Sequence, residues 1–340
     1  MNILSNEVVV TPNIEKRNIL LDNIKGFLII LVVLGHLIAG KSSDAIDVYR
    51  ISHYLIYAVH MPMFILISGI FSKNRYDINK FLKNCIIPYV TFDLLFMLFD
   101  SLGDKFDLNI FVTKNGYWYI LCLGIMRLLV EYTKQKYQYL LLIGSIIGSV
   151  ALIFAANDIW RFLSIGRVLL LFPVFMVGLK FRIEWIGWIR KHWYIFIILA
   201  FIIVALEILL FIGGGVTTGT HNQPQSITDL IFKYIYMMLF TTGLFATFIA
   251  VFPDKHIPII TKCGRNSVMI YLIHFFVVKI IVYVIKISNL QWNNELFGIL
   301  VVISIILSWI LSSDWLNSKY NAYINKISSF FHHVRHNRKS

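Results

Sequence analysis

The stretch "DNIKGFLIILVVLGH", residues 22–36, decides the fold class. It begins with charged and polar side chains, continues as an almost wholly apolar run, and ends on a histidine where a membrane helix ordinarily carries Leu or Ile. Similar apolar runs recur along the chain: 58% of the 340 residues are hydrophobic, 14% are charged, and the mean hydropathy is +0.73. A soluble domain does not have this composition. The sequence therefore predicts an all-α, polytopic membrane protein.

Ten apolar stretches are long enough, or nearly long enough, to cross a hydrocarbon core that needs about 20 helical residues. We place these spans at 23–40, 54–71, 85–99, 117–130, 139–156, 162–180, 193–212, 227–252, 266–285 and 296–311. The third and fourth are short and contain Asp93 and Arg127. A chain with eight spans is the alternative.

The 31 Lys and Arg residues sit in short clusters between the apolar runs. If the amino terminus is cytoplasmic, 21 of them lie in inner segments and 6 in outer segments, as the positive-inside rule requires. We predict a cytoplasmic amino-terminal segment (1–22), one transmembrane domain (23–312) whose first span is a retained signal anchor, and a basic cytoplasmic tail (313–340). The net charge of +13 forms no continuous basic stripe, which argues against nucleic acid and leaves membrane lipids as partners.

The three cysteines, Cys85, Cys122 and Cys263, lie in or near predicted spans and share no metal-ligand spacing. We interpret them as packing residues, so the sequence predicts neither a disulfide framework nor a metal site.

Ionisable side chains within the spans are costly in a bilayer, so they generally face the bundle interior and mark a function. They are His36, His60, Asp93, Arg127, Arg167, Glu207, Lys233, His274 and Lys279. Lys25 and His36 are eleven residues apart, which at about 100° per residue places both on one face of the first helix. We expect His60, near the outer start of the second span, at a similar depth to His36. A structural role for His60 and an anchoring role for Lys25, paired with Asp22, are the alternatives.

The stretch "CGRNSVMIYLIHF", residues 263–275, predicts an anion site at the start of the ninth span. Asn266 or Ser267 caps a helix whose positive end faces the cytoplasm beside Arg265. His274 follows Ser267 by seven residues and shares its helix face. Ordinary capping combined with a topology cluster is the alternative.

Four segments together resemble the bacterial integral-membrane acyltransferase 3 family, in particular its stand-alone sugar O-acetyltransferases of the fucose 4-O-acetylase type. In chain order they are "DNIKGFLIILVVLGH", "HMPMFILISGIF", "RVLLLFPVFMVGLKF" and "GRNSVMIYLIH". The resemblance implies that His36 is the essential histidine of the family. Lys25 stands where the family carries Arg. A lysine at this position keeps the positive charge but lacks the bidentate guanidinium group. His60 and Arg167 match positions favoured in the sugar O-acetylase branch.

The resemblance implies transfer of an acetyl group from cytoplasmic acetyl-CoA to a hydroxyl of a surface polysaccharide or its lipid-linked precursor, in the bacterial cytoplasmic membrane. A neutral histidine suits the general base that this step needs, and His36 is assigned that role. Arg167 or a protonated His60 is the expected oxyanion donor. The candidates for the CoA phosphates are Lys25, Arg265, Asn266 and Ser267.

The acceptor side is assigned to Glu207 and Asp229, near the outer ends of their spans, and to His274. Interfacial anchoring is the alternative for the first two. A different class of function, a transporter or export component for a glycan or lipid-linked sugar, also fits ten spans with interior charges, although no paired halves are visible. A membrane sensor or scaffold explains the spans and leaves the histidines unexplained. A homo-oligomer and polysaccharide-synthesis proteins are the protein partners that we consider.

Overall fold

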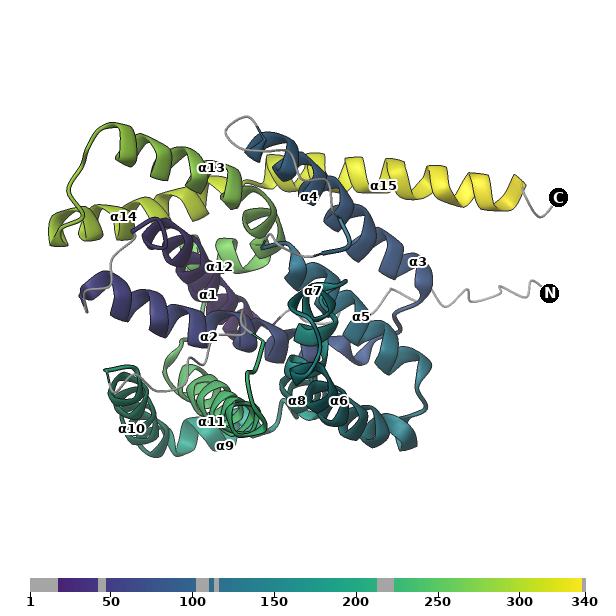
Figure 1. The fold of residues 1–340 in the computed structure, drawn as a ribbon, viewed down its shortest axis with the longest axis horizontal. Helices are drawn as coiled ribbons and strands as arrows, with labels where there is room; N and C mark the ends of the chain where they lie inside the picture. Colours follow the sequence, from purple (N-terminus) through teal and green to yellow (C-terminus); the bar gives the residue numbers. More distant parts are fainter. Residues whose placement is uncertain (1–17, 42–46, 102–109, 113–115, 213–222, 338–340) are drawn as a thin grey trace, which may run out of the picture.

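The computed structural model describes residues 18–41, 47–101, 110–112, 116–212 and 223–337 (Figure 1). Within these ranges every extended element is a helix, and the one strand-like pairing is an isolated bridge between Val112 and Phe162. The predicted all-α, polytopic membrane fold is confirmed.

The helices alternate between long apolar elements and short connecting ones. In chain order they are α1 (Ile19–Ile38), α2 (Val48–Ile70), η1 (Phe71–Lys73), α3 (Ile78–Phe81), η2 (Leu82–Ile86), α4 (Ile87–Asp100), α5 (Trp118–Tyr132), η3 (Gln135–Tyr137), α6 (Gln138–Ile153), α7 (Asn157–Arg161), α8 (Ile165–Lys180), α9 (Trp185–Lys191), α10 (Trp193–Ile212), α11 (Ile227–Val251), α12 (Pro258–Arg265), α13 (Ser267–Ile287), α14 (Asn294–Leu311) and α15 (Asp314–Asn337).

Each of the ten predicted apolar stretches forms a helix, and in the described part of the chain eight helices are long and apolar enough to cross a membrane. The other two are α5, with 15 residues, and α8, with 16 residues. At 1.5 Å per residue they reach about 22–24 Å, less than the roughly 30 Å of a hydrocarbon core. The number of true spans and the side on which the termini lie stay predictions.

The first two long helices form the centre of the bundle (Figure 1). The membrane-spanning windows of α1 and α2 are 67% and 78% buried inside the protein, whereas those of α6 and α10 are 17% and 11% buried. In a membrane protein an apolar helix that is not covered by protein faces lipid. Most of α1 and α2 is therefore enclosed by the bundle, while α6 and α10 lie at its rim.

Two glycines allow α2 and α8 to touch backbone to backbone. A Cβ atom at Gly178 would lie 1.9 Å from the carbonyl oxygen of Leu66, and one at Gly69 would lie 2.3 Å from that of Phe175. Small residues at such crossings allow the close helix packing on which membrane bundles depend. This contact fixes α8, which carries Arg167, against the helix that carries His60.

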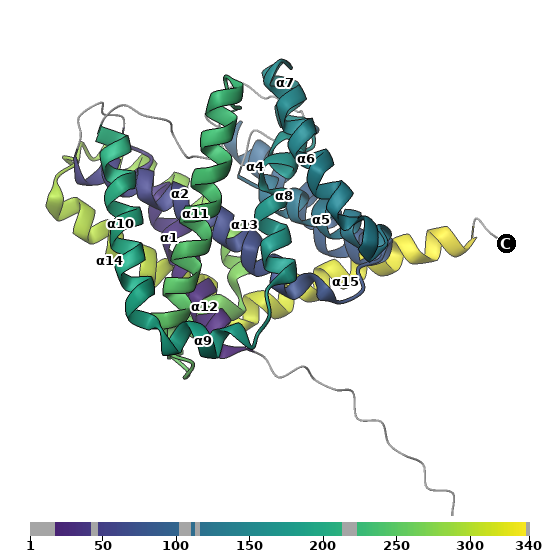
Figure 2. The ribbon, with the colours of Figure 1, turned by 90° about the horizontal axis from the view of Figure 1, so that it is seen from below.

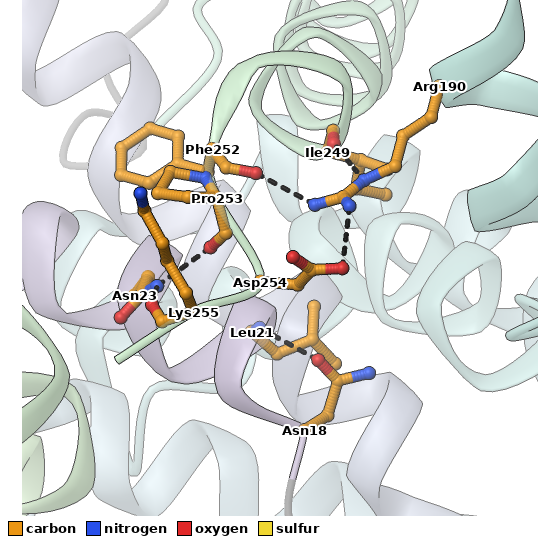
Figure 3. Close-up of polar contacts among 9 residues, drawn as sticks. All are labelled: Asn18, Leu21, Asn23, Arg190, Ile249, Phe252, Pro253, Asp254 and Lys255. Carbon is orange, nitrogen blue, oxygen red and sulfur yellow. Dashed lines mark hydrogen bonds and ion pairs between the residues drawn. The ribbon is translucent and has the colours of Figure 1, made fainter. Parts of the chain in front are cut away.

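The segment before α12 holds the start of α1 through a hydrogen-bond network (Figure 3). The Asn23 amide donates to the carbonyl oxygens of Pro253, at 2.8 Å, and Lys255, at 3.0 Å, and the Asn23 carbonyl accepts from the Thr261 hydroxyl at 2.5 Å. Arg190 closes the same region, because its guanidinium donates to two carbonyl oxygens at the end of α11 and to Asp254.

We call this side of the bundle the inner side. It carries most of the basic side chains that the charge bias predicts to be cytoplasmic, and Figure 2 shows it at the bottom, with α9 and α12. The opposite side, where α1 ends and α2 begins, is the outer side. The predicted basic tail is largely helical: α15 leaves the inner end of α14, runs past α4 and extends beyond the bundle (Figure 2).

Candidate active site

Three helices bring an aromatic and histidine cluster together near the outer end of α1. His36 is half-buried, and its Nδ1 atom lies 3.0 Å from the hydroxyl of Tyr57 on α2. From α13, the His274 ring lies 5.2 Å from that of His36 and the Phe275 ring 4.7 Å from it, measured between centroids. The ionisable ring noted in the opening stretch is therefore packed among side chains from α2 and α13.

His274 is fully buried, and its hydrogen bonds define its tautomer. Nδ1 lies 3.1 Å from the carbonyl oxygen of Ile270 and 2.9 Å from that of Tyr271. A carbonyl oxygen only accepts, so Nδ1 carries the proton and donates it. Nε2 then presents a lone pair, and among the described residues this buried atom has no hydrogen-bond partner. His274 thus offers a buried proton acceptor beside His36.

His60 borders the same cluster from α2. It is 2% exposed, its Nδ1 atom lies 2.5 Å from the carbonyl oxygen of Ile56, and its ring lies 5.0 Å from that of Tyr57. The structure therefore places Tyr57 between the two histidines that were predicted to share a depth. The neutral ring donates from Nδ1, so His60 donates to an oxyanion from Nε2 only when it is doubly protonated. In the described part of the chain, no three His, Cys, Asp or Glu side chains gather as metal ligands.

A cavity of about 220 Å³ opens on the inner side among α1, α2, α5 and α13, and we call it the inner cavity. Its lining includes Lys25, Arg127 and Ser267 towards the inner side, and Tyr119 and Tyr271 further in. Tyr271 lies one helical turn before His274 on α13. The inner cavity therefore leads from a set of cations to the residue next to the histidine cluster.

The cations at this cavity have structural partners as well. The Lys25 ammonium is 2.8 Å from the Asp22 carboxylate, as the anchoring alternative predicted, and 5.2 Å from the centroid of the Phe71 ring. Arg265 is exposed, and its Nε lies 3.9 Å from the same carboxylate. Asp22 therefore holds two of the predicted phosphate ligands near each other, although only Lys25 lines the cavity.

Arg127 is the cavity cation to which the sequence assigned no role. Its guanidinium lies 4.2 Å from the centroid of the Tyr76 ring, and its buried Nε has no hydrogen-bond partner among the described residues. Tyr76 lies between two spans, and burial raises the pKa of its hydroxyl, which therefore stays neutral. Arg127 thus places a positive charge on the cavity wall.

Arg167 lies in the first turn of α8, near the deep end of this pathway. Its side chain is 4% exposed, its guanidinium lies 5.0 Å from the centroid of the Trp118 ring, and Tyr271 lies within electrostatic range. The structure thus places this predicted oxyanion donor near Tyr271, inside the bundle.

Three of the predicted ligands, Asn266, Asp229 and Glu207, lie outside the lining of the inner cavity. The Asn266 amide donates to the Ser312 carbonyl oxygen at 2.7 Å and to Asp314 at 3.1 Å, so it ties α13 to α15. Asp229 lies in the first turn of α11, where its carboxylate is 3.4 Å from Lys233. Glu207 is fully buried on α10, a helix that packs on α11 and α2.

The comparisons with known proteins agree with this architecture. Residues 18–313 match the family model Acyl_transf_3, described as an acyltransferase domain. The chain belongs to the acyltransferase 3 family. A curated relative, the nodulation protein NolL of Mesorhizobium japonicum, is 26% identical over 259 residues, which cover 69% of this chain and 67% of NolL. No solved structure matches the chain.

The family match confirms the resemblance drawn from the four sequence segments. This protein is a multi-pass membrane acyltransferase, and the matched region spans α1 to α14. Sequence reasoning named His36, His60 and His274, which the structure brings to one cluster, and did not name Tyr57 or Tyr271. Tyr57 precedes His60 by three residues, and aromatic residues at that spacing are common in any apolar helix, so no sequence signal marks it.

Proposed function

We propose that this acyltransferase transfers an acetyl group from cytoplasmic acetyl-CoA to a sugar hydroxyl of a surface polysaccharide or its lipid-linked precursor in the bacterial cytoplasmic membrane. The observation that carries the proposal is the inner cavity, which begins among cations and ends at Tyr271, beside the neighbouring rings of His36 and His274. Such a path suits a long donor that has an anionic end and a reactive acyl end.

The inner cavity is too small to enclose the whole of acetyl-CoA. At about 220 Å³ it is smaller than the roughly 300–1,000 Å³ of sites that enclose a whole drug-sized ligand. We therefore assign the cavity to the pantetheine arm and the thioester, and leave the nucleotide at the inner surface. There Lys25 and Arg127 face the phosphates, Ser267 supplies a hydroxyl, and Arg265 lies beside the carboxylate that holds Lys25.

The reaction assigns one proton transfer to His36. Nδ1 keeps its proton and donates a hydrogen bond to the Tyr57 oxygen. Nε2 takes the proton of the acceptor hydroxyl as the hydroxyl oxygen attacks the thioester carbonyl carbon. A tetrahedral oxyanion forms, for which Arg167 is the proposed donor. The C–S bond then breaks, and the CoA sulfur leaves with the proton held by His36. Ester and free CoA thiol are the products, and His36 returns to its starting form.

Reconstitution tests the proposed function. Purified protein in liposomes, supplied with acetyl-CoA and a panel of glycans and lipid-linked sugars, is expected to release CoA in step with the appearance of O-acetyl groups, followed by mass spectrometry. Passage of a sugar across the bilayer with no consumption of acetyl-CoA would instead favour a transporter and contradict the proposal.

Arg127→Gln is expected to raise the KM for acetyl-CoA about tenfold while kcat changes little, because the variant removes a charge contact made equally in the ground and transition states. The measurement is steady-state CoA release in liposomes. Arg182→Gln, which removes an exposed inner-side cation outside the cavity, is the matched control and should leave the KM unchanged. Equal KM values in both variants would exclude Arg127 from the donor site.

A further inference from the structure

The carboxy-terminal helix α15 lies across the direction of the membrane-spanning helices. In Figure 2, α10 and α11 run up the picture, whereas α15 runs across it on the inner side. In Figure 1, α15 again lies in the plane of the picture, while α10 points nearly towards the viewer. Contacts with α4, α13 and the short helix η2 hold α15 against the bundle. A helix with this direction follows the membrane surface instead of crossing the membrane.

One face of α15 packs on the bundle. The Tyr320 ring lies 6.3 Å from the Phe92 ring on α4, measured between centroids, and Ile324 is 3% exposed. At about 100° per residue, side chains at intervals of three or four residues share a helix face. The packed face consists of Leu316, Tyr320, Ile324 and Ile327, none of which is fully exposed.

A second face is polar and uncharged between positions 318 and 329. Its side chains also follow one another at intervals of three or four residues, and all of them are exposed. They are Ser318, Asn321, Asn325 and Ser329. Hydroxyl and amide groups in this position suit contact with water.

Between the packed face and the polar face runs a stripe of aromatic and basic side chains. We call it the α15 stripe, and its members are Trp315, Lys319, Ala322 and Lys326, all exposed. The Lys319 ammonium lies 5.8 Å from the centroid of the Trp315 ring, so these two side chains point the same way. No Asp or Glu follows Asp314 in the sequence. Beyond its first residue, α15 therefore offers the two lysines no carboxylate.

The order of the three faces is that of a helix in the headgroup layer of a bilayer. Trp and Tyr concentrate at the membrane interface, where their rings are partly buried and their polar groups stay wet. Tyr323, which borders the α15 stripe, is 41% exposed, and its hydroxyl lies 3.1 Å from that of Thr91 on α4. The inner leaflet of a bacterial membrane is negatively charged and attracts basic side chains beside an amphipathic helix. The stripe and the leaflet therefore have complementary charge.

We propose that α15 lies in the headgroup layer of the inner leaflet and that the α15 stripe binds anionic phospholipids. Lys319 and Lys326 are the ligands of the lipid phosphates, and Trp315 is the anchor at the interface. The inference does not depend on the donor or the acceptor of the acyl group, so it stands or fails separately from the proposed function.

Spin labels on two faces test the position of α15. Ala322→Cys on the stripe and Asn321→Cys on the polar face each introduce one exposed thiol, whereas Cys85, Cys122 and Cys263 are buried. The full-length protein is labelled in nanodiscs that contain phosphatidylglycerol. Electron paramagnetic resonance then compares collisions of the label with oxygen, which concentrates in lipid, and with a nickel chelate, which stays in water. The oxygen-to-nickel ratio is expected to be several-fold higher at position 322 than at position 321. Equal ratios would place the stripe in water, leave it to a protein partner and overturn the proposal.

Lipid selectivity tests the two lysines. A fluorophore on Ala322→Cys is quenched by nitroxide-labelled phosphatidylglycerol or phosphatidylcholine, each added as a minor component to nanodiscs of neutral lipid. Phosphatidylglycerol is expected to quench at the lower mole fraction. Lys319→Gln or Lys326→Gln should raise the mole fraction of phosphatidylglycerol needed for half-maximal quenching about fivefold, the effect of one basic side chain near an anionic surface, and leave phosphatidylcholine quenching unchanged.

Lys191→Gln is the matched control for these lysine variants. It removes an exposed inner-side cation on α9, which Figure 1 shows at the opposite edge of the bundle from α15, and should quench as the parent does. Equal quenching by the two lipids in the parent protein, or lysine variants that behave as the control does, would overturn the proposal.

Discussion

Replacing His36 by Ala is expected to lower kcat for acetyl transfer by about 10²- to 10⁴-fold, the contribution typical of a positioned general base. The variant removes the imidazole that lies between the Tyr57 hydroxyl and the His274 ring. Binding of acetyl-CoA should persist, because the inner cavity, which we propose as its site, is lined by other residues. Single-turnover formation of the O-acetyl product in liposomes measures the effect.

Two further variants define the role of His36. His256→Gln removes an exposed histidine far from the cluster in the chain and should retain full activity. Tyr57→Phe removes the oxygen that accepts from Nδ1 and should lower kcat about tenfold, with the KM for acetyl-CoA unchanged, because it frees the orientation and tautomer of the ring while keeping the base. Full turnover by His36→Ala would refute the assignment and direct attention to His274, whose Nε2 faces the cluster.

Gly178→Ala is expected to destabilise the protein by about 1–3 kcal/mol, the usual cost of overpacking. The added Cβ would lie 1.9 Å from the Leu66 carbonyl oxygen, a backbone atom that moves only if α2 and α8 separate. Since α8 carries Arg167 and α2 carries Tyr57 and His60, activity should fall together with the temperature of thermal unfolding in detergent.

Gly298→Ala is the control for this prediction. Gly298 lies on the exposed side of α14, where an added Cβ meets no heavy atom within 4 Å. Alanine is intrinsically favoured over glycine within a helix by about 1 kcal/mol, so this variant should be neutral or slightly more stable. The same glycine-to-alanine change is therefore expected to lower the unfolding temperature at position 178 and to leave it unchanged or raise it slightly at position 298. A Gly178→Ala protein as stable as the control would show that α2 and α8 can move apart with little loss of stability.

Hydropathy alone predicted the long elements of the fold, since each of the ten apolar stretches is a helix. It marked the fourth stretch, which is α5, as short, but it did not predict that α8 would be too short to cross the membrane core at right angles. Local sequence gives the length of an apolar run but not the residues at which a helix stops. Trp160, which precedes the sixth predicted stretch, is fully buried and lies where a Cβ on Gly166 would collide with it, so the chain packs inside the protein just before α8 begins.

The candidate site was predictable where a single helix carries its chemistry. Helix periodicity indicated that Lys25 and His36 share a face, and both face the region of α13: Lys25 shares the inner cavity with Ser267, and His36 contacts His274. The hydrogen bond between His36 and Tyr57 depends on how α1 crosses α2, which no local pattern encodes. For the same reason, Arg127 was recognised as an interior charge without a role.

Two of the predicted ligands, Asp229 and Asn266, also have a structural explanation that their position at a helix end supplies. Asp229 was chosen because it lies near an outer helix end, but a carboxylate in the first turn of a helix is also favoured by the helix dipole and by Lys233 one turn later. Asn266 similarly satisfies the Ser312 carbonyl group. Capping and ligand binding use the same residue types, so the two roles can be distinguished only from the three-dimensional structure.

The hydrogen bonds of Asn23 also determine the order in which the acyltransferase can be built during synthesis. Asn23 and Thr261 are 238 positions apart in the chain, as are His36 and His274. The ribosome delivers α1 first, whereas the partners of Asn23 and the histidine that faces His36 are among the last parts to emerge. The first helix must therefore wait in the bilayer with a polar face unmatched, and the inner cavity and the histidine cluster form together in one late event when α12 and α13 arrive.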